Sequence, residues 1–160
     1  MSASNATRVQ HTLLRAWHAW LAGSFLVAYV AADEDTYAIH QFAGYAVLAA
    51  ILARLTAGLL APAGSPLRLP HPTLQAARTW LSERRGRHPL FAWLAAALLA
   101  VVGLTAATGA IADIVGRLEH PHEAIAEASV WLIIVHIAFV AYMYAGKRWL
   151  ARMAAKGTIR

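Results

Sequence analysis

Residues 122–145 read HEAIAEASVWLIIVHIAFVAYMYA, and this stretch decides the fold. A transmembrane α-helix needs about 20 predominantly apolar residues, and the stretch supplies them with its two acids near its beginning. It lacks the period-2 alternation of apolar and polar residues that a strand of a transmembrane barrel requires. We therefore predict a membrane-spanning helix that carries two histidines, His122 and His136, in an apolar setting.

Three further stretches of the same kind precede it. Together the four predicted spans cover about residues 13–32, 37–60, 89–112 and 122–145, with breakers such as Asp33-Glu34-Asp35 between them. The first is too long for a cleavable signal peptide, so we expect it to remain in the protein. The loop of about residues 61–88 is long, and its segment TLQAARTWLSER (73–84) predicts a short amphipathic helix on the membrane surface. The fold class expected is an all-α transmembrane four-helix bundle.

The composition agrees with a membrane setting. The chain has 160 residues, is 59% hydrophobic and only 14% charged, whereas soluble domains are about 45–50% apolar and about 25% charged. A chain this short has too much surface to hide so many apolar residues from water, so residues 1–160 are expected to form one membrane domain. The absence of cysteine excludes disulfides, thiolate metal sites, iron–sulfur clusters and covalent c-type haem.

Charge sets the expected orientation. The formal net charge is +6, and only Arg117 among the basic residues lies outside the N-terminal segment, the end of the second span, the long loop and the C-terminal tail. Seven of the eight acids fall on the opposite side, with Glu83 as the exception. The positive-inside rule then places both termini and the loop of about residues 61–88 in the cytoplasm. Because the basic residues flank spans in separate segments, no nucleic-acid partner is expected.

Four histidines fall inside or at the edge of the predicted spans, where ionisable residues are rare and tend to mark function. At 1.5 Å per residue, His18 and His136 each lie roughly 21 Å inward from the outer end, whereas His40 and His122 lie near it. The fourteen positions between His122 and His136 place both within roughly 40° on one helix face. The four therefore form an outer pair, His40 with His122, and an inner pair, His18 with His136. His120, which precedes Pro121, is expected in a loop.

Two imidazoles on opposite sides of an iron are an axial ligand set for haem, and haem b needs no cysteine. Small residues one turn further along leave room for a flat macrocycle: Ala22, Gly44 and Ala126. Histidines that only pack or relay protons, or a zinc or nickel site, are the alternatives, although no acid lies deep in any span. The cations Arg15 and Arg54 are candidates to meet haem propionates, and snorkelling to lipid headgroups is the alternative for each.

The ordered motifs resemble the bacterial cytochrome b561 and nickel–iron hydrogenase b-type cytochrome family over nearly the whole chain. The matching segments, in chain order, are Arg15-Ala-Trp-His18, His40-Gln-Phe-Ala-Gly44-Tyr45, Arg54-Leu55 with Gly58, Gly86-Arg-His88-Pro89, Thr108-Gly109, His122-Glu123 with His136, and the basic tail from Lys147-Arg148 to Lys156-Gly157. The resemblance implies two bis-histidine haems b and carries the ligand role onto His18, His40, His122 and His136. The family usually has Gly-His-Asn-Pro before the third span, so His88 is displaced and receives no ligand role.

The expected function is electron relay across the bacterial cytoplasmic (inner) membrane, between the quinone pool, with ubiquinone as the candidate quinone, and a c-type cytochrome or dehydrogenase at the outer face. The alternative is a stand-alone superoxide-oxidising quinone reductase, which the acidic outer loops disfavour because an electropositive surface would steer superoxide. A non-redox transporter or anchor is a third possibility. Small residues of the third span offer either a homodimer surface or internal packing: Gly103, Ala106 and Ala107.

Overall fold

The computed structural model describes residues 3–83, 88–146 and 149. Within those residues every regular element is a helix. The elements in chain order are α1 (Ala3–Val30), η1 (Glu34–Thr36), α2 (Tyr37–Leu60), α3 (Leu74–Glu83), α4 (Leu90–Ala112), η2 (Gly116–Leu118), α5 (Glu119–Ala141) and the π-helical turn η3 (Tyr142–Gly146). Several basic residues used to predict orientation lie outside the described residues: Arg84, Arg85, Arg87, Lys147, Arg148, Arg152, Lys156 and Arg160.

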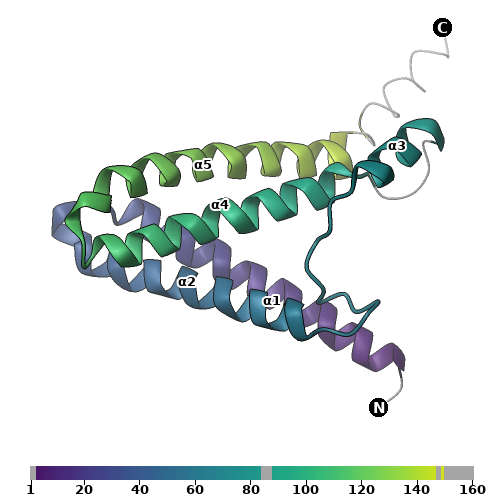
Figure 1. Ribbon diagram of the computed structural model, residues 1–160, viewed down its shortest axis with the longest axis horizontal. Coiled ribbons are helices and arrows are strands. Elements are labelled where there is room, and N and C mark those ends of the chain that lie inside the picture. The colour runs from purple at the N-terminus through teal and green to yellow at the C-terminus, as the bar shows by residue number, and fades with distance from the viewer. Residues whose placement is uncertain (1–2, 84–87, 147–148, 150–160) are drawn as a thin grey trace, which may run out of the picture.

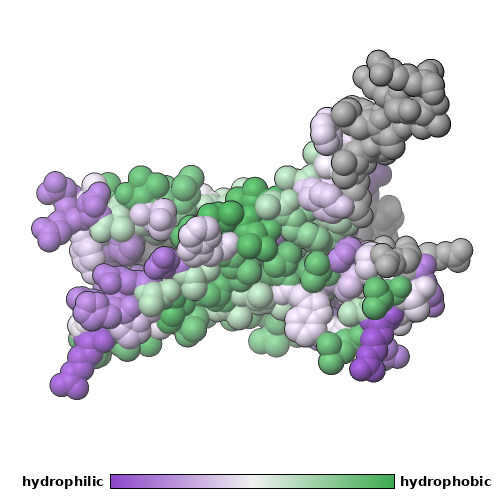
Figure 2. Space-filling model, turned by 90° about the horizontal axis from the view of Figure 1, so that it is seen from above, coloured by the Kyte–Doolittle hydropathy of each residue, from purple (hydrophilic) through white to green (hydrophobic). Residues whose placement is uncertain are grey.

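Four helical segments are long and apolar enough to cross a membrane: Asn5–Val30, Glu34–Leu60, Leu90–Ala112 and Gly116–Gly146. This confirms the prediction of an all-α chain with four candidate spans. The first helix starts well before residue 13, because its polar N-terminal residues continue the same helix beyond the apolar part. Figure 2 shows hydrophobic residues in a band across the middle of the molecule and hydrophilic residues gathered at its two ends, as a bilayer requires.

The helices form two hairpins that pack through α2. Helices α1 and α2 make one hairpin, α4 and α5 make the other, and α2 packs against α4. The short turns η1 and η2 lie at one end of the molecule, and the hairpins diverge toward the other end, where α1 begins and α3 lies (Figure 1). The shared core consists of four buried side chains, Val47, Ile51, Val102 and Ala106.

Helix α2 holds the central place because small residues line its buried face, which includes Ala43, Ala50 and Gly58. On α4, a Cβ atom at Gly103 would lie 3.3 Å from Cγ2 of Ile51, and Ala106 is only 8% exposed. These two small residues therefore pack inside the chain, as one of the two readings of the third span predicted.

The long connection between α2 and α4 contains the short helix α3, as predicted. Its first turn is capped by Thr73, whose Oγ1 accepts a hydrogen bond from the amide of Ala76 at 3.2 Å, and such capping satisfies an otherwise unpaired helix N–H. Trp80 of α3 packs on His88 with ring centres 4.2 Å apart, and His88 packs on Phe139 of α5 at 5.5 Å. An aromatic cluster thus attaches α3 to the end of the second hairpin.

Candidate functional site

His122 is seated on the last turns of α4. Its Nδ1 lies 3.1 Å from the carbonyl oxygen of Thr105 and 3.4 Å from Oγ1 of Thr108. Its ring also lies against Gly109, where an added Cβ would meet Cε1 of the histidine at 2.9 Å. That distance is too short for any real Cβ contact, so the ring occupies its position because residue 109 has no side chain.

His40 is held from two sides. Its Nδ1 lies 2.7 Å from the carbonyl oxygen of Ala28 on α1. Its ring stacks on Tyr37 with centres 6.0 Å apart and planes inclined by 23°. In both His40 and His122, Nδ1 faces a carbonyl oxygen that only accepts hydrogen bonds, which assigns the proton to Nδ1. Nε2 of each ring is therefore left with its lone pair, the arrangement found in histidines that bind metals.

The structure brings the histidines together in the same two pairs that depth along the helices predicted. The ring centres of His40 and His122 lie 6.2 Å apart with planes inclined by 72°. Those of His18 and His136 lie 6.5 Å apart with planes inclined by 41°. Each pair joins the two hairpins, because His18 and His40 belong to the first and both partners belong to α5.

The inner pair lacks the carbonyl contacts of the outer one. Nδ1 of His136 is buried without a hydrogen-bond partner, and it is the one side-chain nitrogen or oxygen in that state within the described residues. Ser129, which lies between His122 and His136 on α5, donates to the carbonyl oxygen of Ala126 at 2.6 Å. A buried polar atom without a hydrogen bond costs about 1–3 kcal/mol of stability, so the Nδ1 atom of His136 is energetically unfavourable as it stands.

The ring separations can be compared with metal geometry. An imidazole nitrogen binds a first-row metal at about 2.0–2.1 Å and lies about 1.15 Å from its ring centre, so two imidazoles facing one metal ion have centres about 6.3–6.5 Å apart. The observed 6.2 Å and 6.5 Å agree with this spacing. The rings of axial ligands rotate about the metal–nitrogen bonds, so either inclination is compatible. A Cβ at Gly44, one turn from His40, would have nothing within 4 Å.

Neither histidine pair has a third metal-binding side chain close to it within the described residues. Within residues 3–83, 88–146 and 149, no group of three or more histidine, aspartate or glutamate side chains lies close enough to hold a metal ion. A zinc ion bound only by protein takes three or four such ligands. The two pairs therefore suit a metal whose other coordination positions are filled by a group that is not protein.

The side chain of Arg54 forms hydrogen bonds and a ring contact within the chain. Its side chain is only 9% exposed, and its Nη1 and Nη2 donate to the carbonyl oxygens of Leu67 at 2.7 Å and Arg68 at 3.1 Å. Its guanidinium carbon also lies 5.7 Å from the centre of the Trp17 ring. Arg54 therefore fastens the long loop to α2 and does not snorkel to headgroups. Arg15, by contrast, is exposed on α1 one turn before His18.

One carboxylate links α4 to α2 near the outer pair. Tyr37 donates to Oδ1 of Asp113 at 2.9 Å, while Gln41 and Tyr45 donate to Oδ2 at 3.0 and 2.8 Å. The three donors follow one another at intervals of four along α2, which places them on one helix face. Burial alone would raise the pKa of Asp113, but the hydrogen bonds from Gln41, Tyr45 and Tyr37 together hold it below its ordinary value of 3.8.

This lowered pKa predicts a pH dependence of stability. The folded chain binds the proton of Asp113 less readily than the unfolded chain, so the carboxylate stabilises the fold above the unfolded pKa, and this stabilisation is lost as the pH falls through the folded pKa. We expect Asp113→Asn to lower the free energy of unfolding by about 1 kcal/mol at pH 7, since the bonds are solvent-exposed, and the difference to shrink as the pH falls below 3.8. Thermal unfolding followed by circular dichroism measures it. A pH-independent difference would contradict the linkage.

His120 does not lie in a loop, contrary to expectation. It occupies the first turn of α5, because Pro121 is tolerated where helix N–H groups have no partner in any case. Its side chain is 96% exposed and lies 3.6 Å from a carboxylate oxygen of Glu123. It takes no part in either pair.

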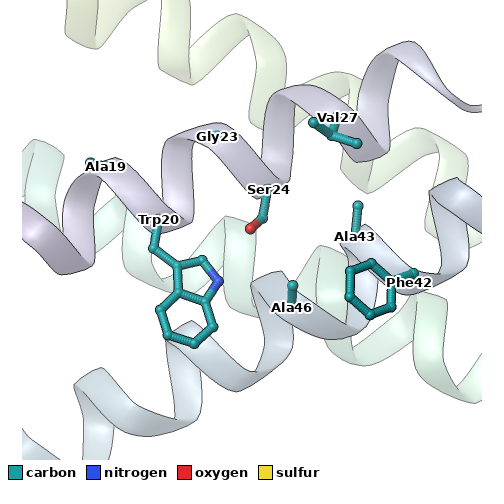
Figure 3. Close-up of a pocket in the computed structure, with 8 residues that line it drawn as sticks. All are labelled: Ala19, Trp20, Gly23, Ser24, Val27, Phe42, Ala43 and Ala46. Atoms are coloured by element: carbon teal, nitrogen blue, oxygen red, sulfur yellow. The ribbon is translucent and has the colours of Figure 1, made fainter.

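A groove of about 340 Å³ lies between α1 and α2. Figure 3 shows Trp20 and Phe42 as its walls, with Gly23, Ala43 and Ala46 between them. At about 100° per residue, Gly23 and Val27 lie on the side of α1 away from His18. The groove is thus separate from the space between the paired histidines.

The contacts that the sequence did not reveal all come from neighbouring helices. Thr105 and Thr108 of α4, and Asp113 at its end, did not stand out in the sequence. The only signal was the i, i+4, i+8 spacing of Tyr37, Gln41 and Tyr45, which places three polar side chains on one face of α2.

Neither protein-family models, nor curated proteins, nor solved structures give a match to this chain.

Proposed function

We propose that the chain is an integral-membrane dihaem b-type cytochrome that relays electrons across a membrane. The single observation that carries the proposal is that the four histidines form two imidazole pairs, with ring centres 6.2 and 6.5 Å apart. A haem iron takes its four equatorial ligands from the porphyrin, so two imidazoles complete its coordination. The resemblance to the bacterial cytochrome b561 family is consistent with the same four ligands, His18, His40, His122 and His136.

When bound, haem b supplies reversible one-electron transfer at its iron. The residues of this chain hold and orient the ligands: the carbonyl oxygens of Ala28 and Thr105 fix the tautomers of the outer imidazoles. His122 and His136 differ by fourteen positions, which places the two sites about 21 Å apart along α5. One site then lies near the outer surface of the membrane and the other well inside it, as a transmembrane relay requires.

The surroundings of the two sites differ in charge. Asp113 lies beside the outer pair, and Arg54 lies toward the opposite end of α2 from His40. Two N–H groups of Arg54 already bind loop carbonyls, and its remaining N–H groups are candidates for a propionate of the inner haem. The distribution of charged residues along the chain supports cytoplasmic termini. The place in the bacterial inner membrane, with quinone and an outer redox protein as partners, is what the resemblance implies.

The test is the visible spectrum of the purified full-length protein. We expect a Soret band, low-spin bis-imidazole bands that sharpen on reduction, and about two haems b per chain by the pyridine haemochrome assay. The chain has no cysteine, so all of this haem should be extracted by acid acetone. Protein that remains colourless after expression with excess haem would contradict the proposal.

A further inference from the structure

We propose that Asp113 is a positioning residue for the outer histidine pair, because its carboxylate fixes the helix that carries His40 against the helix that seats His122. The inference rests on the proposed function for what the pair holds. The link between the two helices, however, rests on the hydrogen bonds of this chain alone.

The first step concerns the seat of His122. Thr105 and Gly109 of α4 determine where that ring lies, through a carbonyl contact and through the missing Cβ. Asp113 follows Gly109 by one helical turn, and its amide donates to the Gly109 carbonyl oxygen at 3.2 Å. A change in the position of the Asp113 backbone is therefore transmitted directly to the surface against which His122 packs.

The second step concerns His40. Its ring stacks on Tyr37, and the hydroxyl of Tyr37 donates to Oδ1 of Asp113. Gln41, the residue after His40, donates to Oδ2 of the same carboxylate. His40 is therefore flanked in sequence and in space by two side chains that Asp113 holds.

The third step concerns what joins α2 and α4 at the end of the molecule where the turns lie. The shared core of α2 and α4 lies deeper, at Val47, Ile51, Val102 and Ala106. Near the turns, Tyr37 and Tyr45 are 52% and 45% exposed, so the hydrogen bonds to Asp113 provide the specific contact between the two helices there. Losing them leaves the distance between His40 and His122 to the surrounding apolar packing, which on α2 includes Ala43 and Val47.

The absence of cysteine allows a direct test of this link. In the full-length protein, Ala38→Cys on α2 and Ile111→Cys on α4 introduce two exposed spin-label sites, and pulsed electron paramagnetic resonance then measures the distance between them. We expect the distance distribution to broaden when Asp113→Leu or Tyr37→Phe is added, with bound haem kept reduced so that its low-spin iron is diamagnetic. Tyr37→Phe removes one hydroxyl and retains the ring, so it serves as the milder variant if Asp113→Leu fails to fold.

Asp33→Asn is the matched control. It removes a carboxylate at the same end of the molecule whose side chain makes no cap hydrogen bond to the following turn. We expect it to leave both the distance distribution and the g values of the outer oxidised haem unchanged, whereas Asp113→Leu and Tyr37→Phe shift those g values. An unchanged distribution in Asp113→Leu, or an equal broadening in Asp33→Asn, would overturn the proposal.

The two proposals fail in different ways. A broadened distribution in Asp113→Leu, measured in protein that binds no haem, would support the link between α2 and α4 and overturn the proposed function. Normal haem binding with no response of the distance or of the g values to Asp113→Leu would overturn the positioning role and retain the proposed function.

Discussion

Replacing His136 with alanine should reduce the haem content from about two per chain to about one, leaving the outer haem in place. His136 faces only His18 among the histidines, at 6.5 Å between ring centres, so the inner iron would keep a single protein ligand. His18→Ala should give the same spectrum. His40→Ala and His122→Ala should both remove the other haem, because these two rings form the second pair.

The measurement is a pyridine haemochrome assay combined with the reduced-minus-oxidised spectrum of each purified variant. The four variants should fall into two spectral classes, one for each pair, and His136→Ala combined with His122→Ala should bind no haem. His120→Ala is the matched control, because it removes an imidazole from the same helix whose side chain is 96% exposed. Four different spectra, or loss of both haems in every single variant, would disprove the pairing.

Gly109→Ala should have the second largest effect. The added methyl would lie 2.9 Å from Cε1 of His122, and inserting a methyl into a filled space costs about 1–3 kcal/mol. The histidine ring must therefore move away from α4, which breaks its contact with the Thr105 carbonyl. We expect the variant to retain the inner haem and to lose most of the outer haem, with the remainder showing altered low-spin g values.

Gly23→Ala provides the control for Gly109→Ala. It adds the same methyl group in the interior of another spanning helix, where nothing lies within 4 Å of the new atom. Alanine favours a helix over glycine by about 1 kcal/mol, so Gly23→Ala should leave the thermal stability unchanged or slightly raised and both haems bound. Equal haem loss in the two variants would show that the close approach of Gly109 to His122 is not what seats the ring.

The prediction of four spans succeeded because hydropathy is a local property of the chain. The second span was placed at residues 37–60, and α2 covers Tyr37–Leu60. The first helix begins before the predicted span of residues 13–32, because a helix does not end where its apolar part ends, and α1 continues back to Ala3. His120 was predicted in a loop because the following residue, Pro121, was taken to interrupt a helix. Proline is in fact tolerated in the first turn of a helix, which is where both residues lie.

The pairing of histidines could also be anticipated from the sequence. Helical rise converts positions along antiparallel spans into depth, and within the predicted spans only two histidines share each depth. The hydrogen-bond partners of Arg54 could not be predicted in the same way. From its position in the sequence, Arg54 was expected either to meet a haem propionate or to reach lipid headgroups. In the fold, its guanidinium instead donates to the carbonyl oxygens of Leu67 and Arg68.

The sequence by itself determined the helical class, the number of candidate spans and the depth of each histidine, because these follow from composition and from regular spacing along one helix. Only the tertiary structure decided what holds the imidazoles: the carbonyl of Ala28 for His40, the seat on α4 for His122, and the carboxylate that joins their helices. Tyr37 and Asp113 are 76 positions apart in the chain. Contacts over such separations depend on how hairpins pack, and no local pattern of residues encodes that packing.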